Sequence, residues 1–290
     1  MRVQLGRQQP IPRPGRRLPL VAPERRTTEW RRGGCSLKSD LAKAGKCRSD
    51  ESALACVRKA SAADLMPVSL AFTQLAYRSS VLPESPAKAM AAGRFHRVPG
   101  LSGNNHDEAA SWLVAFNVSD ENYARLIADM VGLSQAAKVV REYPLSAYDS
   151  AAEAWTAVTT DRIWSCTQVQ NDRQAARFVP TYAYEFADKR SPLASAGQGA
   201  AHAVELPYLF SLGGYDFPLS ETQQTLSNQM VDYWTAFART GDPNGQGRPH
   251  WAATGAGAVR GLSLAPSDQG GIKPVDLGVE HHCDFWAGIN

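Results

Sequence analysis

The 290-residue sequence contains no run approaching about 20 consecutive apolar residues, the length that a helix needs to cross a bilayer. Its first residues are basic but lead into no apolar segment, and a secretory signal requires one. We therefore expect no membrane span and no signal peptide at this start. With 43% hydrophobic residues, the chain is nevertheless long enough to bury a large core in one or two domains.

Lysine is absent from the first 34 residues, which hold nine arginines, five prolines and two acidic residues, a local charge of +7. The remaining residues hold 22 basic and 26 acidic side chains, a charge of −4. We predict that residues 1–34 are a basic leader, either disordered or translated out of frame, and that residues 35–290 form a partial α/β domain. No nucleic-acid-binding motif accompanies the arginines, so no nucleic-acid partner is predicted.

Cysteine is scarce and odd in number, at Cys35, Cys47, Cys56, Cys166 and Cys283. At least one thiol is therefore unpaired. Cys47 and Cys56 bracket a loop short enough for one bridge to close. Paired cysteines are typical of an oxidising compartment, which conflicts with the missing signal and leaves open whether the true amino terminus lies elsewhere.

No group of residues has the spacing of a metal site. Residues 281–284 (HHCD) carry side chains that bind metals, but consecutive residues cannot easily share one tetrahedral ion. His202 and Glu205 form a His-x-x-Glu spacing, which is not the His-Glu-x-x-His motif of zinc proteases. We predict no metal and no cofactor.

Strand and helix patterns alternate along the chain, which favours the α/β class with a largely parallel sheet. Strands are predicted at residues 98–102, 181–186 and 259–264, the last as the final strand, with a turn at residues 103–105. Helices are predicted at residues 49–63, 120–130 and 151–164. The clearest helix begins at Ser220, which can form a capping box with Gln223, and ends at Gly241.

Two isolated residues, Glu108 and His202, are candidates for acid–base chemistry. Glu108 follows a predicted strand and turn, where open α/β sheets place functional groups. A catalytic histidine needs a carboxylate on one ring nitrogen and a nucleophile on the other, and the order acid then histidine is that of α/β-hydrolases. The alternatives are a solvated helix start for Glu108 and a structural role for His202.

Four segments together resemble the carboxy-terminal half of the type-B carboxylesterase family, which includes cholinesterases and bacterial p-nitrobenzyl esterases. They are residues 98–108 (VPGLSGNNHDE), 199–210 (GAAHAVELPYLF), 234–244 (WTAFARTGDPN) and 283–286 (CDFW). The resemblance implies the carboxy-terminal portion of an α/β-hydrolase fold, with an incomplete sheet flanked by helices.

The resemblance also implies roles for particular residues. Glu108 would be the acid of a catalytic triad, His202 its general base, and Glu205 a supporting glutamate near the histidine. Cys47 would pair with Cys56, and Cys166 with Cys283. An intact member would be secreted or periplasmic and would hydrolyse small-molecule carboxylic esters by a serine mechanism, without a cofactor.

The nucleophile of that family is missing from this sequence. No serine lies in a Gly-x-Ser-x-Gly elbow, and Gly33-Gly34 stands in the wrong context to supply oxyanion-hole amides. Ala203 replaces the glycine that usually follows the histidine, and Ala109-Ala110 replaces the Gly-Ser that usually follows the glutamate. We therefore expect an ester hydrolase family member that is inactive as this chain, the serine-bearing half being absent. The alternative is a non-catalytic binding protein on a cholinesterase-like scaffold.

Overall fold

The computed structural model describes residues 52–66, 79–215 and 217–289. It divides between Arg94 and Phe95 into two compact units. The predicted leader, residues 1–34, and the predicted domain boundary after it lie outside the described residues.

The unit that ends at Arg94 contains, in its described part, three short helices: α2 (Ala53–Lys59), α3 (Ala62–Leu65) and α4 (Pro86–Ala91). The prediction of one helix over residues 49–63 is wrong, because Ala60 and Ser61 have extended backbones. Ser61 instead forms a capping box with Asp64, which begins a second helix.

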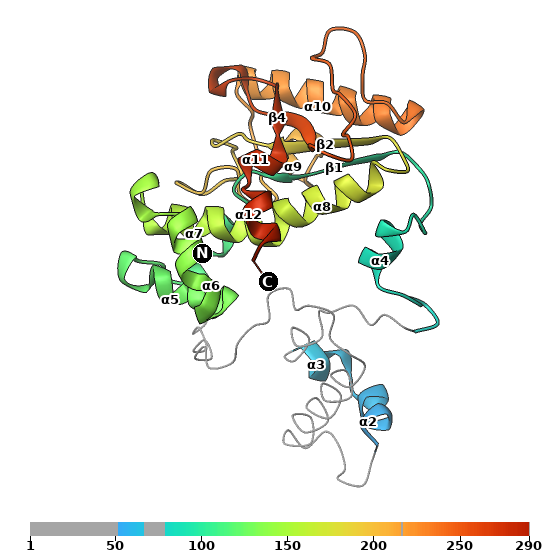
Figure 1. The fold of residues 1–290 in the computed structure, drawn as a ribbon. Helices are drawn as coiled ribbons and strands as arrows, with labels where there is room; N and C mark the ends of the chain where they lie inside the picture. Colours follow the sequence, from blue (N-terminus) through green and yellow to red (C-terminus); the bar gives the residue numbers. More distant parts are fainter. Residues whose placement is uncertain (1–51, 67–78, 216, 290) are drawn as a thin grey trace, which may run out of the picture. The chain divides into compact units, whose positions relative to one another are not determined.

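A four-stranded sheet organises the unit that starts at Phe95 (Figure 1). Its strands are β1 (Gly100–Asn105), β2 (Thr181–Phe186), β3 (Arg260–Leu264) and β4 (Lys273–Asp276), in that spatial order. The first three are parallel, which confirms the predicted α/β class and largely parallel sheet. The strand predicted over residues 259–264 is confirmed as β3, but it is not the last strand, because β4 follows it in the sequence and pairs antiparallel with it. The sequence of β4 contains Pro274, which obscures its strand character.

Strand β1 lies later in the sequence than predicted. It begins at Gly100 and continues to Asn105, through the residues expected to form a turn. Gly103 serves close packing there, since a Cβ at this position would lie 2.6 Å from Cγ of Tyr184 on the neighbouring strand. The glycine therefore signals the close approach of two strands and not a chain reversal.

Helices cover both faces of the sheet, with α10 on one face and α8 on the other (Figure 1). The longer helices are α5 (Asp120–Val131), α6 (Leu133–Glu142), α7 (Ala151–Thr160), α8 (Cys166–Ala175) and α10 (Glu221–Thr240). The shorter ones are η2 (Glu108–Ala115), η3 (Leu145–Ala147), η4 (Asp161–Ser165), α9 (Leu206–Leu209), η5 (Ser267–Gln269), α11 (Leu277–Glu280) and α12 (Cys283–Ala287). Among the described residues, no helix is both long and apolar enough to cross a membrane.

The prediction for α10 is confirmed at both ends. Ser220 and Gln223 form the capping box, and Gly241 ends the helix with a left-handed φ of 77°. The predicted end of the helix over residues 151–164 is wrong. Helix α7 passes at Thr160 into the π-helical turn η4 and then directly into α8.

Side chains of β2 alternate between two cores. Tyr182 and Phe186 pack in the cluster that contains Leu226 and Met230 of α10. Ala183, on the opposite face, packs with Val169 of α8. This alternation buries β2 on both sides and holds the carboxyl ends of β1 and β2 at one edge of the sheet.

Candidate functional site

The two candidate residues meet where β1 and β2 end. Glu108 begins η2 directly after β1, and His202 lies in the loop that follows β2. His202 Nδ1 donates to Glu108 Oε2 at 2.6 Å. The structure thus brings together two residues that are 94 positions apart in the sequence.

Glu108 is buried and both of its carboxylate oxygens are used. Its side chain is 9% exposed, and Oε1 accepts a hydrogen bond from the backbone amide of Asn105 at 2.9 Å. The other oxygen is aimed at His202. A carboxylate held this way can orient an imidazole and stabilise its protonated form.

Glu205 follows His202 by three residues in the same loop and is joined to Ala201 of that loop through a third residue. Asn105 Nδ2 donates both to Glu205 Oε2 at 2.5 Å and to the carbonyl of Ala201 at 2.6 Å. Burial, together with the negative charges of Glu205 and Glu108, raises the pKa of Tyr184 to about 12. Asn105 was missed in the sequence, although an amide at the carboxyl end of a strand is a signal of a functional edge.

The other ring nitrogen of His202 is open. The side chain of His202 is 51% exposed, and within the described residues its Nε2 has no hydrogen-bond partner. The ring packs against Trp112, with centroids 5.0 Å apart, and Trp112 in turn stacks on Trp164 at 5.1 Å. Nε2 is the atom through which a histidine base accepts a proton from a nucleophile. The two tryptophans were not identified from the sequence.

The loop that carries His202 has unusual backbone angles. Ala203 has a φ of 69°, in the left-handed region that costs an L-residue about 1–2 kcal/mol. Gly199, three residues before His202, has a φ of 60°. The departure from glycine at residue 203 therefore places strain directly next to the candidate base.

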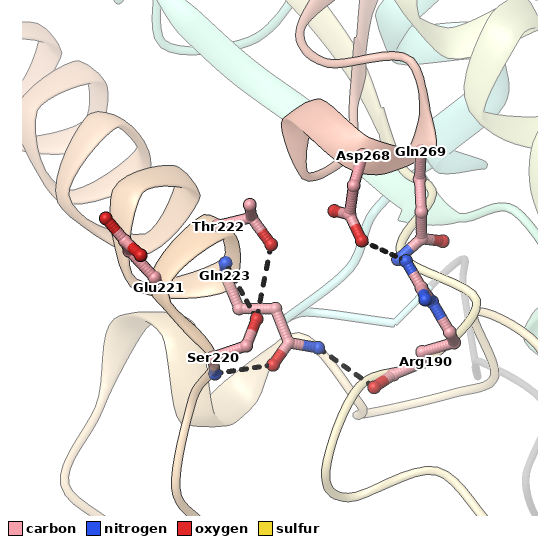
Figure 2. Close-up of a pocket in the computed structure, with 7 residues that line it drawn as sticks. All are labelled: Arg190, Ser220, Glu221, Thr222, Gln223, Asp268 and Gln269. Atoms are coloured by element: carbon pink, nitrogen blue, oxygen red, sulfur yellow. Dashed lines mark hydrogen bonds and ion pairs between the residues drawn. The ribbon is translucent and has the colours of Figure 1, made fainter.

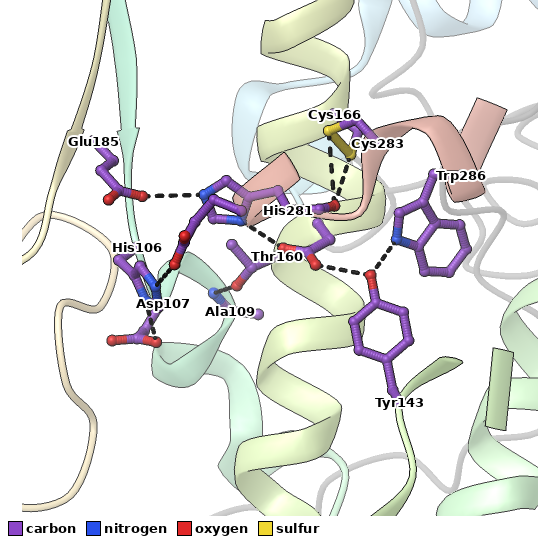
Figure 3. Close-up of polar contacts among 12 residues, drawn as sticks. His106, Asp107, Ala109, Tyr143, Thr160, Cys166, Glu185, His281, Cys283 and Trp286 are labelled. Atoms are coloured by element: carbon purple, nitrogen blue, oxygen red, sulfur yellow. Dashed lines mark hydrogen bonds and ion pairs between the residues drawn. A yellow bond between two sulfur atoms is a disulfide. The ribbon is translucent and has the colours of Figure 1, made fainter. Parts of the chain in front are cut away.

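A second polar network surrounds the buried side chain of His281 (Figure 3). His281 is buried between two carboxylates, with Nδ1 2.6 Å from Asp161 Oδ1 and Nε2 3.3 Å from Glu185 Oε2. The hydroxyl of Tyr143 donates to Asp161 Oδ2 at 2.8 Å and accepts from Trp286 Nε1 at 2.7 Å. Burial lowers the pKa of His281, but the bonds to Asp161 and Glu185 outweigh it and raise that pKa to about 9.

The side chains of residues 281–284 do not point toward a common site that could hold a metal ion. His281 contacts Asp161 and Glu185, whereas His282 Nδ1 lies 2.6 Å from Glu142 Oε1. Cys283 forms a disulfide with Cys166, with Cα atoms 5.1 Å apart (Figure 3). Across the described residues, no group of three or more His, Cys, Asp or Glu side chains is arranged to hold a metal ion.

The Cys166–Cys283 bridge confirms one predicted disulfide and ties α12 to α8. The other predicted pair stays a prediction, because Cys47 lies outside the described residues, although Cys56 is disulfide-bonded.

A hollow of about 390 Å³ lies at the start of α10, away from this pair (Figure 2). Its polar groups bind one another: Arg190 pairs with Asp268, and Gln223 Nε2 donates to the carbonyl of Arg190 at 2.9 Å. Neither Glu108 nor His202 lines it. The candidate site is therefore the edge at the ends of β1 and β2.

Comparisons with known proteins find a matching family and several similar proteins. Residues 31–286 match the family described as the carboxylesterase family. The chain is 26% identical over 231 residues to pyrethroid hydrolase Ces2e of Rattus norvegicus, 27% over 246 residues to acylcarnitine hydrolase of Mus musculus and 26% over 224 residues to cocaine esterase of Homo sapiens. These matches cover 70%, 74% and 69% of this chain, and 40%, 43% and 40% of the respective relatives. The chain thus spans less than half the length of these relatives.

The Ala203→Gly variant is expected to be more stable than the natural chain by roughly 0.5–1 kcal/mol. Relief of the left-handed strain outweighs the greater freedom of glycine in the unfolded chain. Urea unfolding measures the difference. Ala176, which has an ordinary φ of −58°, is the matched control, and Ala176→Gly is expected to lose stability. A loss of stability in Ala203→Gly contradicts the expectation.

Stability is expected to fall as the pH rises from 6.5 through about 9, because the pKa of His281 is raised in the folded chain. The charged ring contributes stability fully below its unfolded pKa of 6.5 and loses it above about 9, a change on the order of 3 kcal/mol. Urea midpoints across this window measure it.

His281→Gln is expected to be less stable below pH 6.5 and to lose much of this slope. The exposed His96 is the control, and His96→Gln is expected to keep the natural slope. Stability of the natural chain that is flat or rising over this window contradicts the expectation.

Proposed function

The chain belongs to the carboxylesterase family, and we propose that it carries the acid–base half of a serine ester hydrolase. The observation that carries the proposal is the 2.6 Å hydrogen bond from His202 Nδ1 to Glu108 Oε2, with Nε2 open on the other side of the ring. Glu108 is the acid of the triad, His202 the general base and Glu205 a supporting carboxylate.

In this role the imidazole moves one proton at a time. Glu108 keeps the proton on Nδ1, so the lone pair of Nε2 is free to accept the proton of a serine hydroxyl as that oxygen attacks the ester carbonyl. The imidazolium then returns the proton to the departing alcohol. Water then attacks the acyl carbonyl and gives a proton to Nε2, the bond between the serine oxygen and the acyl carbon breaks, and Nε2 returns the proton to the serine oxygen as the acid leaves.

The serine belongs to a segment that this chain does not supply. The sequence contains no Gly-x-Ser-x-Gly elbow, and the chain spans less than half of its relatives. We propose that a serine-bearing segment completes the site, and that this chain alone does not hydrolyse esters. Two relatives are named as hydrolases and one as an esterase, which supports a small-molecule carboxylic ester as the substrate class.

A binding protein on the same scaffold is supported less well. The buried carboxylate of Glu108 accepts one hydrogen bond from a backbone amide and one from the exposed imidazole of His202, and binding alone requires no such arrangement. The Cys166–Cys283 disulfide is in keeping with an oxidising compartment for the complete enzyme.

The purified chain is expected to release p-nitrophenol from p-nitrophenyl acetate no faster than buffer alone and without a burst, and to bind no fluorophosphonate at serine. Both results follow from the missing nucleophile, since a burst reports an acyl-serine. A serine esterase treated in parallel supplies the positive control, and intact-protein mass spectrometry reads the labelling. Stoichiometric attachment of the fluorophosphonate to a serine of this chain would overturn the expected inactivity.

Glu108→Gln is expected to slow carbethoxylation of His202 by diethyl pyrocarbonate on the order of tenfold. The amide of glutamine can donate to Nδ1, which moves the proton to Nε2 and removes the lone pair that reacts. Peptide mass spectrometry measures the rate at each histidine. The exposed His96 serves as the internal control, and its rate is expected to stay unchanged. An equal rate at His202 in both proteins counts against Glu108 as the acid.

A further inference from the structure

A second carboxylate, that of Asp107, lies next to Glu108 but is directed at the backbone of the histidine loop. Asp107 Oδ2 accepts a hydrogen bond from the amide of Ala200 at 2.9 Å. The amide of Asp107 donates to the carbonyl of Ala200, also at 2.9 Å. These two bonds join the turn after β1 to the loop after β2, two residues before His202.

Gly199 leaves room for this attachment. A Cβ at residue 199 would lie 2.3 Å from Asp107 Oδ2, and the φ of 60° disfavours any other residue. The carboxylate of Asp107 therefore occupies space that a side chain at position 199 would fill.

The remaining carboxylate oxygen of Asp107 is hydrogen-bonded to the side chain of His106. His106 Nδ1 lies 2.9 Å from Asp107 Oδ1, and His106 Nε2 lies 3.4 Å from Glu280 Oε1 (Figure 3). Burial lowers the pKa of His106, but the bonds to Asp107 and Glu280 outweigh it and hold that pKa well above its usual value. Burial raises the pKa of Asp107, but the bonds from His106 and Ala200 outweigh it and hold that pKa below its usual value. The two side chains thus form an ion pair.

The histidine loop is held at consecutive residues by groups from residues 105–108, at the end of β1 and just after it. Asp107 binds Ala200, Asn105 binds the carbonyl of Ala201, and Glu108 binds the ring of the next residue. The side-chain amide of Asn105 that donates to the Ala201 carbonyl also donates to Glu205. Asp107 supplies both of the bonds to Ala200, one through its carboxylate and one through its backbone amide, so removal of the side chain leaves the loop with the backbone bond alone on the side that precedes His202.

We propose that Asp107 is a positioning residue, which sets the Glu108–His202 hydrogen bond by holding Ala200 while His106 fixes the Asp107 carboxylate. It touches neither the ester nor the reacting atoms. The assignment rests on the proposed function, because Glu108 and His202 are the residues that it positions.

Proton NMR of the folded 290-residue chain tests the proposal without requiring ester hydrolysis. An imidazole Nδ1 proton bonded to a carboxylate at 2.6 Å resonates far downfield of the backbone amides, and His202→Gln assigns the signal by removing it. In Asp107→Ala, exchange of this proton with water is expected to be on the order of tenfold faster, because the carboxylate bond to the Ala200 amide is lost and the backbone bond to the Ala200 carbonyl is left alone.

Asp107→Asn is the conservative variant. Its carbonyl oxygen can still accept from Ala200, so it is expected to restore most of the slow exchange. Asp172→Ala is the matched control, since Asp172 is also buried and accepts from Ser102 of β1 at 2.7 Å. It is expected to reduce overall stability while the His202 proton remains. The proton shared by His281 and Asp161 is an internal reference that is expected to persist in every variant.

Unchanged exchange in Asp107→Ala, or equal acceleration in Asp172→Ala, overturns the positioning role and leaves the Glu108–His202 pair standing. Absence of the signal from the natural chain overturns the pair itself, and with it the proposed function.

If Asp107→Ala does not fold, His106→Ala takes its place. That variant leaves the bonds to Ala200 but frees the carboxylate, so exchange several-fold faster than in the natural chain is expected, and no change overturns the proposal.

Discussion

The parallel pairing of β1 with β2 is the constraint on which the candidate site depends. Their register aligns Asn105 with Phe186, so both strands end at the same edge of the sheet. The turn after β1 and the loop after β2 therefore leave the sheet side by side. Packing of Tyr182 and Phe186 under α10, and of Ala183 against α8, keeps that register, because a shift of one residue would exchange the two faces.

Three carboxylates near this edge have different neighbours and therefore different tasks. Glu108 meets the imidazole directly, Glu205 shares the side-chain amide of Asn105 with Ala201 of the same loop, and Asp107 holds the backbone of that loop. Each lies within hydrogen-bond distance of at least one donor, which is what allows several acidic groups to be half-buried or buried close together. The resemblance to the family implied roles for Glu108 and Glu205, whereas the contact of Asp107 with the loop is seen only in the structure.

Behind the edge, two histidines supply the positive charge that balances the buried acids. His281 lies between Asp161 and Glu185, and His106 lies against Asp107. The rings of the two histidines are 5.7 Å apart. The Cys166–Cys283 disulfide anchors the segment that carries His281. The carboxy-terminal helices thus support the turn that bears Glu108, although they lie far from it in the sequence.

Predictions from the sequence succeeded where the signal is local. The strand over residues 181–186 and the helix between Ser220 and Gly241 follow from β-forming residues, a capping box and a glycine stop, each contained in a few neighbouring positions. They failed where distant contacts decide. Gly103 was predicted to be part of a turn, whereas in the structure it allows Tyr184 of the neighbouring strand to approach closely. The π-helical turn η4 begins at Asp161, and the contact of Asp161 with His281 cannot be seen in the local sequence.

The sequence by itself determined the family, through four motifs, and the absence of a Gly-x-Ser-x-Gly elbow, because both depend on residue identity alone. It singled out Glu108 and His202 as an acid and a base. Only the tertiary structure decided that they touch, that Asn105 and Asp107 hold the loop between them, and that His281 is buried between two acids. Those facts are distances between residues far apart in the chain, and they are set by sheet register and packing, which no local pattern specifies.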